Sequence, residues 1–143
     1  MKTFNKCKFC ILFLLILPYI LIFGSCAPLQ IVQVHVINRL PDGMTMTLHC
    51  QSHETDLGQS ILEVGEEVDW SFRVNYWGTT LFFCDVQWDG NGFIWYHFNA
   101  YDATRDYRRC RTECWWVITQ EEMLYGYNQE TDSWEMLPFL NSV

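Results

Sequence analysis

Hydrophobic and polar residues alternate with a period of two through most of this chain, which is the pattern of half-buried β-strands. The clearest case runs from Thr80 to Trp88, where every second residue, including Phe82 and Cys84, falls on one apolar face. A cluster rich in Gly and Asn follows at residues 89–92, and a second aromatic run ends at Tyr101. Two such runs around that cluster predict a β-hairpin. We expect its first arm to be a central strand with Cys84 pointing into the core.

The same alternation predicts further short strands along the chain. They cover residues 31–40, 44–50, 60–64, 66–74, 114–118, 124–127 and 133–137. A Pro-Asp-Gly turn at 41–43 predicts that the first two form a hairpin, and the last two are predicted to pair around residues 128–132. No segment of ten residues has helical periodicity, and residues 102–113 are predicted to be a long connection. The fold class is therefore all-β: a small antiparallel β-sandwich of about seven or eight strands with two disulfides.

The first 26 residues are predicted to be a secretory signal peptide rather than part of the fold. Three lysines precede a 13-residue apolar run at 11–23, which is followed by Gly24, Ser25 and Cys26. An apolar run of that length is too short to span a bilayer comfortably. Two alternatives stay open, an uncleaved signal anchor and a lipoprotein acylated on Cys26. We expect residues 27–143 to form one domain, secreted to the extracellular space, with no stable membrane insertion after removal of the signal.

The charge of the remaining chain restricts its partners. All three lysines lie in the leader, so residues 27–143 carry six arginines against seventeen acidic residues, a net charge of −11. Such a chain is repelled by nucleic acid and by anionic lipid, and we expect neither as a partner. We expect a monomer.

Four of the seven cysteines lie outside the leader, namely Cys50, Cys84, Cys110 and Cys114. An even number of cysteines behind a signal peptide predicts disulfides, here two. Three pairings are possible, and we favour Cys50 with Cys114 and Cys84 with Cys110.

Several residue groups resemble catalytic or metal sites without completing one. His49, Cys50 and His53 offer metal ligands, but a zinc site needs a fuller set at fixed spacing. Ser52, His53 and Asp56 supply the residue types of a catalytic triad, but triads are assembled from separate elements, and the chain has no Gly-x-Ser-x-Gly motif. We predict no catalytic residue, no metal, no cofactor and no enzymatic activity.

Arginines and tryptophans supply the candidate contact residues. Four of the six arginines fall within residues 102–113, interleaved with acids, so they either pair locally or form an anion site. Most of the seven tryptophans are expected in the core, because aromatic side chains bury large areas. Trp77 lies in a predicted turn and is the best candidate for an exposed partner anchor.

Taken together, several short motifs resemble the plant self-incompatibility S-protein family, whose members include the S-protein homologues. They are Val36-Ile37-Asn38, Leu48-His49-Cys50-Gln51-Ser52, Asp56-Leu57-Gly58, Trp70-Ser71-Phe72, Thr80-Leu81-Phe82-Phe83-Cys84, Trp88, Cys110 and Cys114-Trp115. The resemblance covers residues 31–137 and keeps the family's order. It departs at residues 120–123, which read Gln-Glu-Glu-Met where the family usually has an Asp-Gly turn.

The resemblance implies a secreted, disulfide-bonded β-sandwich, which in the best-known members is a pistil ligand recognised by a pollen receptor. We therefore predict a non-enzymatic recognition ligand that binds a cell-surface receptor protein in cell–cell signalling. Variable loops would carry specificity. The candidate contact residues in these loops are His53, Asp56, Trp77, Asn91, Arg105, Arg108, Arg109 and Arg111. The alternative is a secreted carbohydrate-binding or defence protein that uses exposed aromatic residues.

Overall fold

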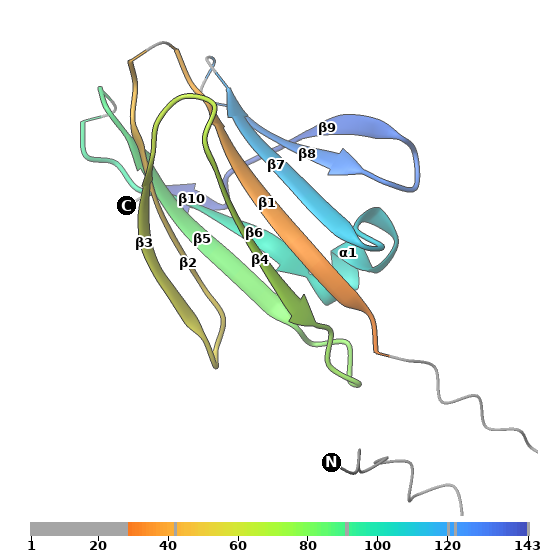
Figure 1. The fold of residues 1–143 in the computed structure, drawn as a ribbon. Helices are drawn as coiled ribbons and strands as arrows, with labels where there is room; N and C mark the ends of the chain where they lie inside the picture. The colour runs from red at the N-terminus through yellow and green to blue at the C-terminus, as the bar shows by residue number, and fades with distance from the viewer. Residues whose placement is uncertain (1–28, 42, 91, 120, 122, 143) are drawn as a thin grey trace, which may run out of the picture.

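Two β-sheets pack face to face in the computed structural model, which describes residues 29–41, 43–90, 92–119, 121 and 123–142 (Figure 1). The first sheet, sheet A, has the order β4-β1-β7-β8-β9, and the second, sheet B, has the order β10-β6-β5-β2-β3. The strands of sheet A are β1 (Ile31–Arg39), β4 (Glu67–Arg73), β7 (Glu113–Thr119), β8 (Leu124–Asn128) and β9 (Ser133–Leu137). Those of sheet B are β2 (Met46–Gln51), β3 (Asp56–Leu62), β5 (Leu81–Trp88), β6 (Tyr96–Asp102) and the two-residue β10 (Asn141–Ser142). The predicted β-sandwich is confirmed, with more strands than the pattern indicated.

The core lies between the sheets and uses the alternating apolar faces. On β1 the side chains of Val32, Val34 and Val36 are fully buried, and on β5 the apolar face including Cys84 and Val86 is buried as predicted. β5 lies in the middle of sheet B between β6 and β2, which confirms it as a central strand. The β5–β6 and β8–β9 hairpins are also confirmed.

The predicted hairpin between residues 31–40 and 44–50 is wrong. β1 lies in sheet A, where it pairs antiparallel with β4 and parallel with β7, whereas β2 lies in sheet B between β5 and β3. The turn after β1 therefore carries the chain from one sheet to the other. Because β1 and β7 run parallel, the sandwich is not wholly antiparallel.

The segment predicted to be a long connection contains a short helix, α1 (Ala103–Arg109). Asp102 caps its N-terminus by accepting hydrogen bonds from the Thr104 backbone N–H at 2.9 Å and from the Thr104 hydroxyl at 2.6 Å. At its C-terminus the Cys110 N–H donates to the Asp106 carbonyl. Seven residues are too few for helical periodicity to show in the sequence.

Both disulfides are present, but the predicted pairing is wrong. Cys50 bonds to Cys84 and Cys110 bonds to Cys114. Cys50 and Cys84 lie directly opposite each other on β2 and β5, with their Cα atoms 4.1 Å apart. Cys114 begins the buried face of β7 in the other sheet, next to the end of α1. Each bridge therefore joins neighbouring segments, and neither links the two sheets.

The predicted signal peptide, residues 1–26, lies outside the described residues. Among the described residues, no helix is both long enough and apolar enough to cross a membrane.

Candidate recognition site

Three connections predicted to carry contact residues meet at one end of the sandwich, the lower end in Figure 1. They are the β2–β3 loop, the β4–β5 loop and the start of α1. The register of sheet B places them together, because Gln51 pairs with Phe83 and Leu81 pairs with Asp102. The Ala103 N–H also donates to the Thr80 carbonyl at 3.0 Å, which ties α1 to the β4–β5 loop. We call this region the loop end.

A cleft of about 400 Å³ lies between the β2–β3 and β4–β5 loops. Its lining combines hydroxyl, amide and charged groups with a floor of Phe72 and Phe82. The lining residues are Ser52, His53, Glu54, Thr55, Phe72, Arg73, Asn75, Thr79, Thr80, Leu81 and Phe82.

The β4–β5 loop is closed by its own side chains. In the Asn75 side chain, Oδ1 accepts from the Thr79 N–H at 2.9 Å and Nδ2 donates to the Thr79 hydroxyl at 2.8 Å. The backbone N–H of Asn75 donates to the Thr80 hydroxyl at 2.8 Å. This ring of hydrogen bonds leaves Tyr76 and Trp77 projecting from the loop, 80% and 81% exposed. Their rings meet edge to face, with centroids 5.3 Å apart. The two rings thus form an exposed aromatic pair on a turn that hydrogen bonds hold in place.

The β2–β3 loop is braced in a similar way and carries negative charge. The Ser52 hydroxyl accepts from the N–H groups of Glu54 and Thr55. Asp56 accepts from the Gly58 N–H at 2.8 Å and lies 2.7 Å from Nε2 of His49. These two hydrogen bonds, with that from Gly58 the stronger effect, hold the pKa of Asp56 below its usual range, so its carboxylate is charged near neutral pH.

A buried carboxylate and two arginines anchor α1. Asp106 is fully buried and accepts a bidentate pair of hydrogen bonds from Arg105, at 2.8 and 2.6 Å. The Arg109 guanidinium lies 3.4 Å from Asp106, 3.4 Å from Glu135 on β9, and 4.6 Å from the centre of the Trp116 ring. The contacts of Arg109 with Glu135 and Trp116 hold α1 against sheet A. Three of the four arginines in residues 102–113, namely Arg105, Arg108 and Arg109, thus pair with carboxylates of the same chain, one of the two alternatives that the sequence left open.

Burial also constrains a neighbouring tyrosine. The Tyr101 hydroxyl has no hydrogen-bond partner among the described residues, and its side chain is fully buried. Burial, with the nearby charges of Asp106 and Asp102, raises the pKa of Tyr101 to about 12. It is therefore neutral and structural at physiological pH.

The predicted contact residues fall into four groups: exposed, partly exposed, buried and outside the described residues. His53, Asp56 and Trp77 are exposed at the loop end, and Arg108 on α1 and Arg111 just after it are exposed as well. Arg105 is partly exposed but bound to Asp106. Arg109 is only 6% exposed, so its assignment as a contact residue is wrong. Its guanidinium instead pairs with Asp106 and Glu135 inside the fold. Asn91 lies outside the described residues.

Sequence reasoning missed Tyr76 and Gly126. Tyr76 is as exposed as Trp77, and its place in the same Asn75–Gly78 turn was the available signal. Gly126 gives room to Arg109, a contact that no local pattern predicts.

One group of potential metal ligands occurs among the described residues, formed by Asp106, Cys110 and Cys114. Both cysteines are in a disulfide and Asp106 is bound by two arginines, so none of the three is free to bind an ion. Ser52 and His53 both line the cleft. The Ser52 hydroxyl accepts hydrogen bonds from two backbone N–H groups, and this gives it a structural role in the β2–β3 loop.

Comparison with known proteins matches residues 33–138 to the family model described as plant self-incompatibility protein S1. The chain belongs to this family. The self-incompatibility protein S1 of Papaver rhoeas is 32% identical over 127 residues, which cover 88% of this chain and 89% of that protein. S-protein homolog 29 of Arabidopsis thaliana is 30% identical over 132 residues, 90% of this chain and 94% of the homolog. S-protein homolog 5 is 35% identical over 96 residues, 67% and 72% of the two chains.

A solved structure of a self-incompatibility protein homologue has the same fold. It aligns with a TM-score of 0.56 and 16% identity, covering 77% of this chain and 97% of the homologue. That homologue is described as belonging to a widespread family of small, highly stable, secreted plant proteins. This S-protein family chain therefore shares its architecture, including the predicted sandwich, with a structurally characterised relative.

Proposed function

We propose that this chain is a secreted recognition ligand that binds a cell-surface receptor protein through its loop end and catalyses no reaction. Membership of the self-incompatibility family supports a role in cell–cell recognition, and the secreted homologue supports an extracellular site. The two disulfides and the apolar pattern of the leader sequence agree with secretion.

The observation that carries the proposal is the aromatic pair Tyr76–Trp77. Tyr76 and Trp77 are both about four-fifths exposed and lie in contact, so they form a contiguous exposed aromatic surface rather than a single exposed side chain. Trp and Tyr are also enriched among the residues that dominate binding energy. The pair stands beside a polar cleft whose rim bears His53 and Glu54. A receptor surface can bury the two rings while the loop groups supply hydrogen bonds and charge specificity.

The test is binding of the labelled, disulfide-bonded protein to plant cells, including pollen, before and after protease treatment of the cells. We expect saturable binding that protease treatment removes. Trp77→Ala should weaken it at least about tenfold, the loss typical of a central anchor. Phe93→Ala is the matched control, because Phe93 is 87% exposed but lies in the β5–β6 loop at the opposite end.

Two results would contradict the proposal. One is binding that survives protease but is lost after glycan removal. The other is equal weakening by Trp77→Ala and Phe93→Ala, which would indicate non-specific adhesion through exposed aromatic rings.

A further inference from the structure

The outer face of sheet A is apolar where water should favour polar side chains. The outward positions along the middle of β7, β8 and β9 carry no charge. They are Trp115, Val117, Tyr125, Tyr127, Trp134 and Met136. A sheet with one face on the core usually presents polar residues on the other. Sheet B carries polar side chains in the middle of its outer face, where His49, Asp85 and His97 form one cross-strand row. We call the six residues of sheet A the aromatic face.

Strand pairing makes the aromatic face continuous. Val117 pairs with Tyr125, which pairs with Met136, so one apolar row crosses all three strands. In the next row Tyr127 and Trp134 are paired, with ring centroids 5.4 Å apart. On β7 the face continues at Trp115, which pairs with His35 on β1. The His35 and Trp115 rings are stacked, with centroids 3.8 Å apart.

The face is in contact with solvent, partly at Trp115, Val117, Tyr125 and Tyr127 and most at β9. α1 contacts the opposite side of β8 and β9, where Arg109 meets Gly126 and Glu135. On the outer side, Trp134 is 50% exposed and Met136 is 59% exposed. A contiguous exposed apolar surface of this kind marks an interaction site.

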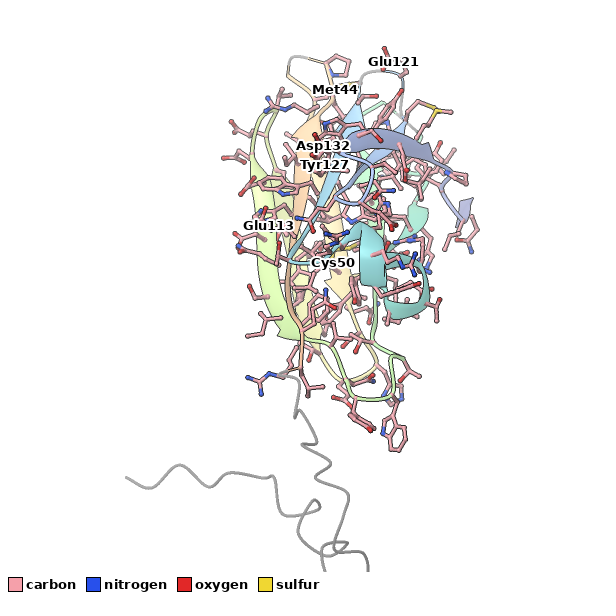
Figure 2. The ribbon with its side chains drawn as sticks, turned by 90° about the vertical axis from the view of Figure 1, so that its right-hand side faces the viewer. Met44, Cys50, Glu113, Glu121, Tyr127 and Asp132 are labelled. Carbon is pink, nitrogen blue, oxygen red and sulfur yellow. A yellow bond between two sulfur atoms is a disulfide. The ribbon has the colours of Figure 1, made fainter. Side chains whose placement is uncertain are left out.

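Carboxylates border the aromatic face and indicate the charge of its partner. Glu113 accepts from the Trp115 indole N–H at 2.9 Å, and Asp132 accepts from the Tyr127 hydroxyl; Glu113, Tyr127, Asp132 and Glu121 are labelled in Figure 2. On the β4 side, Glu67 and Asp69 pair with β1 next to the same rows. Glu121 lies just after the end of β7, where its carboxylate accepts a hydrogen bond from the Thr119 hydroxyl.

Two other occupants fit this surface less well. Addition of a strand to β9 is disfavoured because Glu135 points inward to Arg109 and Asn128, and Pro138 follows the strand; both features discourage edge pairing. A second copy of the chain would bring one acidic border against another, and residues 27–143 carry a net charge of −11.

We propose that the aromatic face is a second docking surface, for a cationic segment of another protein that has one apolar side. The partner's apolar residues cover Trp134 and Met136, and its Lys or Arg side chains meet the acidic border and the faces of the aromatic rings. This surface lies apart from the loop end, and the proposal does not depend on the receptor proposed above.

The test uses two synthetic amphipathic peptides with the same leucine positions, one with lysine and one with glutamate on the polar side. Binding to the intact disulfide-bonded protein is measured by titration calorimetry and located by NMR shifts. We expect the lysine peptide alone to bind, more weakly as salt rises. We expect the shifted resonances to lie on β7, β8 and β9.

The double variant Trp134→Ala/Met136→Ala should weaken lysine-peptide binding at least about tenfold. Ile61→Ala is the matched control, because Ile61 is an apolar side chain, 69% exposed, on β3 of the other sheet. Glu67→Gln combined with Glu113→Gln should reduce the salt dependence while the apolar contact remains.

Three outcomes would overturn the proposal. They are absence of lysine-peptide binding, equal binding of both peptides, and binding unchanged by the double variant. A sedimentation mass that doubles with concentration in the wild type, and stays monomeric in the double variant, would assign the aromatic face to a second copy instead.

Discussion

Gly126 lacks a side chain at the point where the Arg109 guanidinium lies against the backbone of β8. A Cβ built there would stand 1.8 Å from Nη2 of Arg109 and 2.8 Å from the Trp116 ring. Its backbone is not in the left-handed region, so the requirement is space rather than conformation. A single absent methyl group thus lets a buried cation reach both Asp106 and Glu135.

Gly126→Ala should therefore lower the free energy of unfolding by about 2–4 kcal/mol, because the Arg109 guanidinium must leave its buried partners or the strands must separate. Urea denaturation of the disulfide-bonded protein measures this loss. In the Arg109→Ala background the same substitution should cost much less, since the guanidinium is gone. Additive losses in that double-mutant cycle would show that Arg109 is not what the glycine accommodates.

At the scale of elements, α1 depends on the side chain that precedes it. The Asp102 carboxylate accepts from the hydroxyl and the N–H of Thr104, and mainly for this reason the pKa of Asp102 lies below its ordinary value of 3.8. Because the folded pKa is lowered, the ionised cap stabilises the fold fully above the unfolded value. That contribution is lost as pH falls through the folded pKa.

Asp102→Ala should lower the free energy of unfolding by about 1 kcal/mol at pH 6, the typical cost of losing a helix cap. The difference from the wild type should shrink as pH falls below 3.8. Asp102→Asn keeps a capping oxygen and should retain most of the stability without this pH dependence. Equal stability of all three proteins at pH 6, measured by urea denaturation, would show that the cap contributes nothing to the fold.

Elements were predictable from sequence where the signal is local. The alternation that defines β5 and the turn residues after Trp88 predicted a central hairpin, because both signals depend only on neighbouring residues. The partner of β1 was not predictable in this way. Its alternating valines fit an antiparallel pairing with β2 as well as the observed parallel pairing with β7, which begins 74 residues further on at Glu113. At the loop end, single contact residues could be predicted from the sequence. The cleft could not, because it forms only when β2 and β5 pair in the observed register.

At the scale of the whole molecule, the two bridges fasten different parts of the sandwich. Cys50–Cys84 ties two adjacent central strands of sheet B, and Cys110–Cys114 ties the end of α1 to the start of β7. The loop end is thus braced on both sides, beside the β2–β3 loop and behind α1. This arrangement agrees with the proposed recognition role, in which the loops must keep their shape.

The bridges should contribute unequally to stability. Their sequence separations are 34 and 4 residues, so loop-closure entropy gives about 4 kcal/mol for Cys50–Cys84 and about 2 kcal/mol for Cys110–Cys114. Cys50→Ala/Cys84→Ala should therefore lower the free energy of unfolding by about twice as much as Cys110→Ala/Cys114→Ala, measured by urea denaturation with the other bridge intact. Mass mapping of a non-reduced digest tests the pairing itself. If loss of the shorter bridge lowers the free energy of unfolding more than loss of the longer one, then contacts around Arg109, rather than chain entropy, set the contribution of the shorter bridge.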